Sequence, residues 1–69
     1  MTVEFNEVGR AKANWSAECE EITYDWLYKQ VKAHGVLSSR SLDFAYDEEK
    51  NVGKIYAGFY VIGIFKCEG

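Results

Sequence analysis

Residues 14–35 read NWSAECEEITYDWLYKQVKAHG, and this stretch has the strongest helical signal in the chain. At about 100° per residue, its apolar side chains fall on two faces. One face comprises Trp15, Cys19, Ile22, Trp26 and Ala33, and the other comprises Ala17, Tyr24, Leu27, Tyr28 and Val31. A narrow charged stripe between them comprises Glu18, Glu21, Asp25, Lys29 and Lys32. The spacing predicts a long helix over about 15–34 that carries more apolar surface than one contact can cover.

The ends of this stretch agree with a helix. Asn14 or Ser16 can accept hydrogen bonds from the free amides of a first turn, and acids follow at once. Lys29 and Lys32 lie near the other end, where the helix dipole favours positive charge. Gly35 is then the expected left-handed stop.

Period-two alternation predicts strands on either side of the helix. Residues 2–8 place Val3 and Phe5 on one side, and residues 41–46 place Leu42, Phe44 and Tyr46 on one side. Residues 47–51 read as a turn, with Asn51 or Gly53 able to take a positive φ. Residues 54–67 read as one strand that is apolar on both faces, with Gly58 and Gly63 as sites of a bulge or bend. The expected fold class is α+β, a single β-α-β-β domain over 1–69 with the long helix packed on a three-stranded, mostly antiparallel sheet.

Composition narrows the function class. The chain has 69 residues, of which 48% are hydrophobic and 16% aromatic, so it is expected to fold as one globular domain. The net charge of −3 opposes binding to nucleic acid, and no long basic run offsets it. The longest apolar run is too short for a membrane-spanning helix, and residues 1–10 do not resemble a signal peptide. A cytoplasmic protein with no membrane association is therefore expected.

Few residues are available for chemistry. His34 is the only histidine, and in one helix it would lie about 22 Å from Cys19 at 1.5 Å per residue. Cys19 and Cys67 show neither a close pair nor metal-ligand spacing, and they are expected to be small buried hydrophobes. Glycine-rich phosphate loops and dinucleotide fingerprints do not occur in the sequence. We therefore expect no catalytic residues, no metal and no cofactor.

The apolar surplus predicts a surface that contacts another molecule. A helix that crosses a three-stranded sheet leaves one helix face or one sheet face partly exposed, and large exposed patches usually mark interaction sites. The expected interface residues are Tyr24, Leu27, Tyr28, Val31, Tyr56, Tyr60 and Ile62. A homodimer through the surplus helix or sheet face is the leading structural hypothesis.

Three kinds of binding module compete. The first is a small inhibitor or adaptor that docks on another protein through its aromatic side chains. The second is a nucleic-acid-binding dimer that uses Arg10, Lys12, Lys29 and Lys32. The third is an acidic mimic of nucleic acid, with carboxylates from Glu18, Glu20, Glu21, Asp25, Asp43, Asp47, Glu48 and Glu49. The composition favours the first.

Residues 44–59, FAYDEEKNVGKIYAGF, follow the helix end HGVLS at 34–38. This half of the chain resembles small uncharacterised accessory proteins of phages and prophages of Gram-positive bacteria. The resemblance carries no catalytic or ligand motif. It implies a context in which such proteins bind and inhibit a host protein, including nucleases or CRISPR effectors of antiviral defence.

Overall fold

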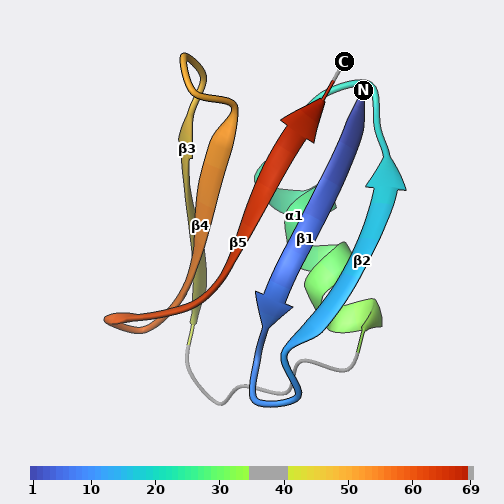
Figure 1. The fold of residues 1–69 in the computed structure, drawn as a ribbon. Helices are drawn as coiled ribbons and strands as arrows, with labels where there is room; N and C mark the ends of the chain where they lie inside the picture. The colour runs from blue at the N-terminus through green and yellow to red at the C-terminus, as the bar shows by residue number, and fades with distance from the viewer. Residues whose placement is uncertain (35–40, 69) are drawn as a thin grey trace.

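The computed structural model describes residues 1–34 and 41–68, which form a bent antiparallel sheet and one helix (Figure 1). Along the chain the elements are β1 (Thr2–Val8), β2 (Ala13–Glu18), α1 (Tyr24–Ala33), β3 (Leu42–Asp47), β4 (Val52–Ala57) and β5 (Tyr60–Glu68). The strands are ordered β2-β1-β5-β4-β3, and every neighbouring pair is antiparallel. The two outer strands are therefore β2 and β3.

This architecture corrects the predicted fold class. The described residues form five strands and a short helix, rather than three strands and a long helix. The largest error is β2, which occupies the start of the predicted helix. Trp15 and Ala17 are half-buried while Ser16 and Glu18 are exposed, so the burial has the period of a strand. A segment this short fits both periods, and pairing with β1 selects the extended conformation.

The helix begins well after the first expected cap. The Thr23 side chain accepts a hydrogen bond from the backbone amide of Trp26 at 3.2 Å, which satisfies one free amide of the first turn. Lys32 lies in the last turn, as predicted, and Asp25 is the acid in the first turn. The acids predicted at the helix start, Glu18, Glu20 and Glu21, all precede the helix. The predicted stop at Gly35 lies outside the described residues.

The predicted strand over 54–67 is two strands joined by a tight turn. Ala57 pairs with Tyr60, which leaves Gly58 and Phe59 as a two-residue loop. Gly58 has a φ of 63°, whereas Phe59 does not have a positive φ. This combination is a type II′ turn, whose first central position requires glycine. The bend expected at Gly58 is therefore a complete reversal of the chain.

Two of the predicted elements are confirmed. β1 buries Val3 and Phe5 fully, and β3 alternates between inward and exposed residues from Leu42 onward. In the turn that follows β3, the Asp47 carboxylate accepts hydrogen bonds from two backbone amides at 3.0 and 3.3 Å. Asn51 takes the positive φ, at 56°.

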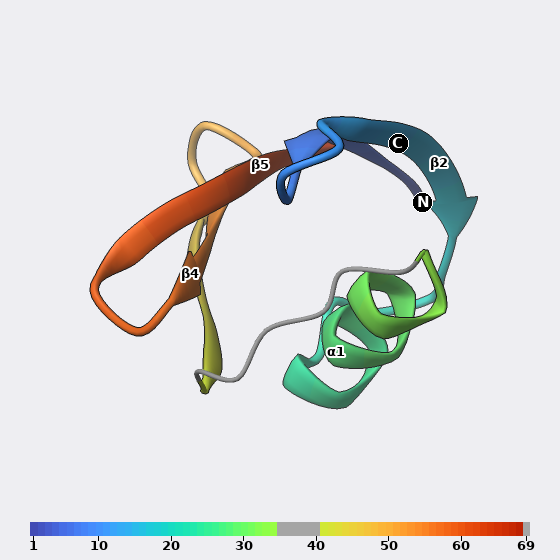
Figure 2. The ribbon, with the colours of Figure 1, turned by 90° about the horizontal axis from the view of Figure 1, so that it is seen from below.

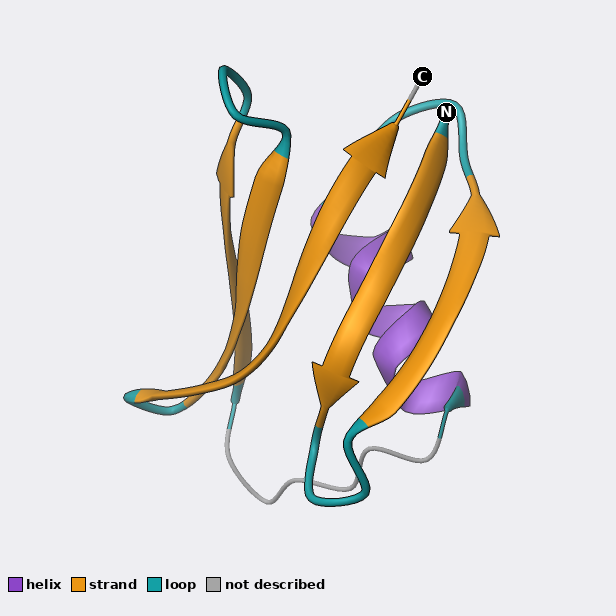
Figure 3. Ribbon diagram, viewed as in Figure 1, coloured by secondary structure: helices purple, strands orange, loops and turns teal. Residues whose placement is uncertain are grey.

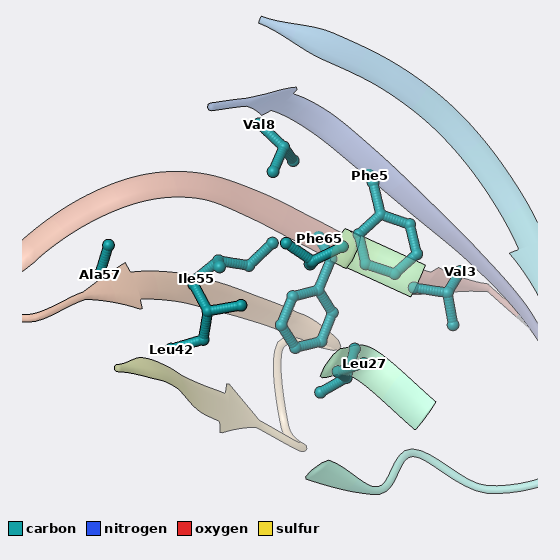
Figure 4. Packing of buried hydrophobic residues seen from close by; sticks show 9 residues of the cluster. Val3, Phe5, Val8, Leu27, Leu42, Ile55, Ala57 and Phe65 are labelled. Atoms are coloured by element: carbon teal, nitrogen blue, oxygen red, sulfur yellow. The ribbon is translucent and has the colours of Figure 1, made fainter. Parts of the chain in front are cut away.

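The sheet bends into an arch, and α1 lies across its open side (Figures 2 and 3). The buried core lies between them, and Figure 4 shows how its side chains converge from the strands and the helix. It comprises Val3, Phe5, Val8, Leu27, Val31, Leu42, Ile55, Ala57 and Phe65. Gly53 lets the Phe65 ring pass close to β4, since a Cβ at that position would lie 2.1 Å from Cζ of the ring.

The helix is attached to both outer strands. Near its end, Trp15 of β2 stacks on His34 at a centroid distance of 3.9 Å, and its Nε1 donates to Oε1 of Gln30 at 3.1 Å. At its start, the Tyr24 hydroxyl donates to the carbonyl oxygen of Leu42 in β3 at 2.8 Å. The short helix therefore connects the two ends of the arch.

Candidate functional site

The predicted interface residues fall into three environments. Leu27 and Val31 are 2% and 0% exposed, because α1 turns them into the core. They therefore stabilise the fold and are not part of an exposed helix face, which corrects the expectation that the helix presents a broad apolar surface. Tyr56 and Ile62 are half-buried. Tyr24, Tyr28 and Tyr60 are exposed.

The two helix tyrosines are engaged within the chain. Tyr24 packs edge-on against Phe44 at 5.3 Å, and its ring stacks beside that of Tyr28 at 6.1 Å. The Lys32 ammonium lies 5.6 Å from the centre of the Tyr28 ring, within range of a cation–π interaction. Tyr24 therefore holds α1 against β3, and each of the two tyrosines offers only part of its ring to a partner.

The largest exposed apolar group is at the turn between β4 and β5. Phe59 is 96% exposed, and its neighbours Tyr60 and Val61 are 65% and 52% exposed. We call these three consecutive residues the hairpin tip. Among the described residues only six large hydrophobic side chains are exposed, and the hairpin tip supplies half of them. Figure 1 shows the β4–β5 turn extending away from the rest of the sheet.

The backbone at the hairpin tip is well defined by its hydrogen bonds. The amide of Gly58 donates to the carbonyl oxygen of Ser41 at 3.1 Å, which attaches the turn to the start of β3. The register of β4 and β5 shifts beside Tyr56, so β5 carries a bulge near Ile62. The carbonyl oxygen of Ile62 accepts a hydrogen bond from the amide of Gly9 at 2.8 Å. The side chains of the hairpin tip are thus exposed, while hydrogen bonds at Gly58 and Ile62 hold the backbone on either side of them.

Sequence reasoning identified Tyr60 but missed Phe59 and Val61. Reading 54–67 as one strand placed Phe59 and Val61 on the same side as Ile55 and Ala57, and not on the side of Tyr56, Tyr60 and Ile62, which was expected to form the interface. The available signal was Gly58 directly before the aromatic pair, since glycine at the first central position is typical of a type II′ hairpin.

A second feature lies at the opposite end of the sheet. A cleft of about 320 Å³ is lined by Met1, Glu20, Glu21, Ile22, Tyr46, Glu48 and Asn51. The Tyr46 hydroxyl lies 3.3 Å from Oδ1 of Asn51, to which it donates. A hydrogen bond with Cys67, together with burial, raises the pKa of Tyr46 to about 12.

The two cysteines are closer than their sequence separation suggested. Both are free and half-buried. Burial raises the pKa of the Cys19 thiol, and the nearby Cys67 thiol raises it further, against the opposing charge of the N-terminal ammonium. These shifts favour the protonated forms of Cys19 and Tyr46, which are poor nucleophiles. Within residues 1–34 and 41–68, no three side chains are grouped as ligands for a metal ion.

The charged residues of the alternative hypotheses are spread over several elements. Arg10 and Lys12 lie in the turn between β1 and β2, whereas Lys29 and Lys32 lie on α1. No helix in the described part of the chain has the length and apolar character needed to span a membrane. Comparison with known proteins returned no matching family model, no matching curated protein and no matching solved structure.

Proposed function

We propose that this chain is a small non-enzymatic protein-binding module whose hairpin tip inserts into an apolar pocket on a partner protein. The observation that carries the proposal is the 96% exposure of Phe59 at the end of an ordered hairpin. A side chain that contacts so little of its own chain adds almost nothing to folding. Exposed aromatic residues on ordered elements are the usual anchors of protein interfaces.

The gain available on binding is large. An aromatic side chain buries ~150–250 Å² when it is fully enclosed. At ~25 cal/mol per Å², burial of Phe59 alone is worth ~4–6 kcal/mol before the costs of association. Tyr60 and Val61 add to this, and the type II′ turn reduces the ordering cost because the backbone is already fixed.

The nature of the partner is proposed from the sequence resemblance. The chain resembles small accessory proteins of Gram-positive phages, and such proteins bind host proteins. The proposed partner is therefore a host protein, for example a component of antiviral defence. An inhibitor or adaptor role follows if the pocket that receives Phe59 belongs to a functional site of that host protein. The basic residues of the nucleic-acid-binding alternative are divided between the β1–β2 turn and α1. Three acids of the acidic-mimic alternative, Glu20, Glu21 and Glu48, line the cleft, but within the described ranges none of the acids has an exposed aromatic side chain beside it comparable to the hairpin tip.

Affinity capture from bacterial lysate tests the proposal, using the intact chain and two matched variants. Phe59→Ser removes the anchor, and serine suits the second central position of a type II′ turn. Glu49→Ser alters the exposed β3–β4 turn instead and serves as the control. The proposal expects one protein to be captured by the wild type and by Glu49→Ser but lost with Phe59→Ser. Equal capture by all three chains would refute the hairpin tip as the binding surface.

A further inference from the structure

The sheet has two outer strands, β2 and β3, and they differ in whether side chains bind the backbone groups along their free edges. On β3, the carbonyl oxygen of Leu42 accepts from the Tyr24 hydroxyl at 2.8 Å. The next outward group, the amide of Phe44, donates to the Asp43 carboxylate at 2.8 Å. Side chains therefore occupy two of the backbone groups that an added strand would need, which partly protects this edge.

The outward groups of β2 follow from its pairing with β1. The N-terminal ammonium of Met1 donates to the carbonyl oxygen of Cys19 at 2.9 Å, and the amide of Cys19 donates to the carbonyl oxygen of Met1 at 3.0 Å. In an antiparallel ladder such hydrogen-bonded pairs alternate with non-hydrogen-bonded pairs. With Thr2 opposite Glu18 and Glu4 opposite Ser16, the backbone groups of Ser16 and Glu18 point away from β1.

No side chain in the described part of the chain takes the place that Tyr24 and Asp43 have on β3. The Asn14 side chain turns back to the β1–β2 connection, where it binds the amide of Glu7 and the carbonyl oxygen of Lys12. Ser16 is too short to cover its own edge. As far as residues 1–34 and 41–68 are concerned, the β2 edge is therefore available to another strand.

We propose that a second copy of this chain pairs with that edge, β2 against β2 and antiparallel, centred on Ser16. To form ladder hydrogen bonds, residues whose backbone N–H and C=O groups point away from β1 must lie opposite the same kind of residue in the second copy. The register centred on Ser16 meets this condition along the strand. Ser16 then lies opposite Ser16, and Glu18 lies opposite Asn14, so no carboxylate faces another. On the core side, Trp15 lies opposite Ala17, which places a large side chain beside a small one.

The strand sequence is thus self-complementary about one residue, as a two-fold interface requires. The pairing joins two bent sheets into one continuous sheet. It also leaves the hairpin tip free, because β2 and the β4–β5 turn lie on opposite sides of the sheet (Figure 1). A dimer of this kind presents two hairpin tips to a partner, and it uses a different surface from the helix or sheet face expected from the sequence.

Sedimentation velocity over a wide range of concentration tests the dimer. The edge is short, so we expect weak association that rises with concentration. Ser16→Pro removes the outward amide without removing a bond to β1, and Ser16→Lys places two ammonium groups opposite each other. Each should weaken dimerisation at least ~10-fold, since like charges and lost ladder bonds oppose strand pairing.

Two control variants show whether the loss of dimerisation is specific to the β2 edge. Glu4→Gln changes the charge on the neighbouring strand, opposite Ser16 but away from the edge, without placing like charges opposite Lys66 of β5, and should leave dimerisation unchanged. Phe59→Ser should also leave it unchanged. Circular dichroism checks that each variant is folded. A wild-type chain that stays monomeric at every concentration, an unchanged dissociation constant in folded Ser16→Lys, or loss of the dimer in Phe59→Ser would each overturn the proposal.

Discussion

A methyl group added at Gly53 is expected to destabilise the fold strongly. Gly53 lies in β4, and a Cβ built there would lie 2.1, 2.4 and 2.6 Å from three atoms of the Phe65 ring. Real Cβ contacts are almost never below 3.0 Å, so either the ring or the strand must move. Phe65 is 0% exposed and packs between Phe5 at 6.0 Å and Tyr46 at 5.8 Å, so the ring has little room to retreat.

The magnitude follows from two opposing terms. Overpacking a close-packed core costs ~1–3 kcal/mol, and the enclosed ring places Gly53→Ala at the upper end. Alanine in place of glycine in a strand returns ~0.5–1 kcal/mol. The net loss is about 2 kcal/mol, out of the ~3–10 kcal/mol that a chain of this size has in total. For such a domain this lowers Tm by roughly 8–16 °C.

Urea unfolding followed by tryptophan fluorescence measures this loss directly. A second background tests the cause: in Phe65→Leu the ring is absent, so adding Gly53→Ala should cost less than ~1 kcal/mol. Gly53→Ala with wild-type stability, or with the same loss in both backgrounds, would refute the packing of Phe65 over Gly53.

Three further predictions concern the helix cap, the Tyr46 hydroxyl and the hairpin tip. Thr23→Ala should lower the free energy of unfolding by ~1 kcal/mol, because the amide of Trp26 loses its acceptor. Thr23→Ser keeps a hydroxyl acceptor and should have most of the wild-type stability. Thermal unfolding of the three chains measures both effects. The pKa of Tyr46 is raised from 10.0 to about 12, so folding favours its protonated form; this stability is complete below pH 10 and is lost as the pH rises toward 12. Urea titrations over that window should show a steeper loss for the wild type than for Tyr46→Phe. Phe59→Ser should change the free energy of unfolding by less than ~0.5 kcal/mol, because the ring is 96% exposed; a larger loss in a urea titration would show that Phe59 supports the fold.

The sequence predicted best where one pattern dominated a whole element. The alternation that places Val3 and Phe5 on one side of residues 2–8, and Leu42 and Phe44 on one side of residues 41–46, corresponds to β1 and β3 as observed. The error over 14–18 arose because so short a segment fits a helix and a strand equally well, and the choice depends on pairing with a distant partner. Thr23 was the local signal that the helix starts later.

The candidate site was only partly predictable for a related reason. Tyr60 was expected on a surface, but its setting changed once Gly58 and Phe59 formed a turn. Tyr24 is exposed and Leu27 is buried because of the way α1 lies against the bent sheet. Helical periodicity alone does not predict that orientation. The unequal protection of β2 and β3 rests on hydrogen bonds such as that from the Tyr24 hydroxyl to Leu42, which join segments far apart in the chain.

Site-specific photo-crosslinking in bacterial cells tests the proposed function most directly. A photoreactive phenylalanine analogue at position 59 should form one adduct of defined mass with a host protein, and excess wild-type chain should suppress it. The same analogue at position 49, in the exposed β3–β4 turn, should not form that adduct. Adducts that are absent at position 59, or identical at both positions, would contradict the assignment of the hairpin tip as the protein-binding surface.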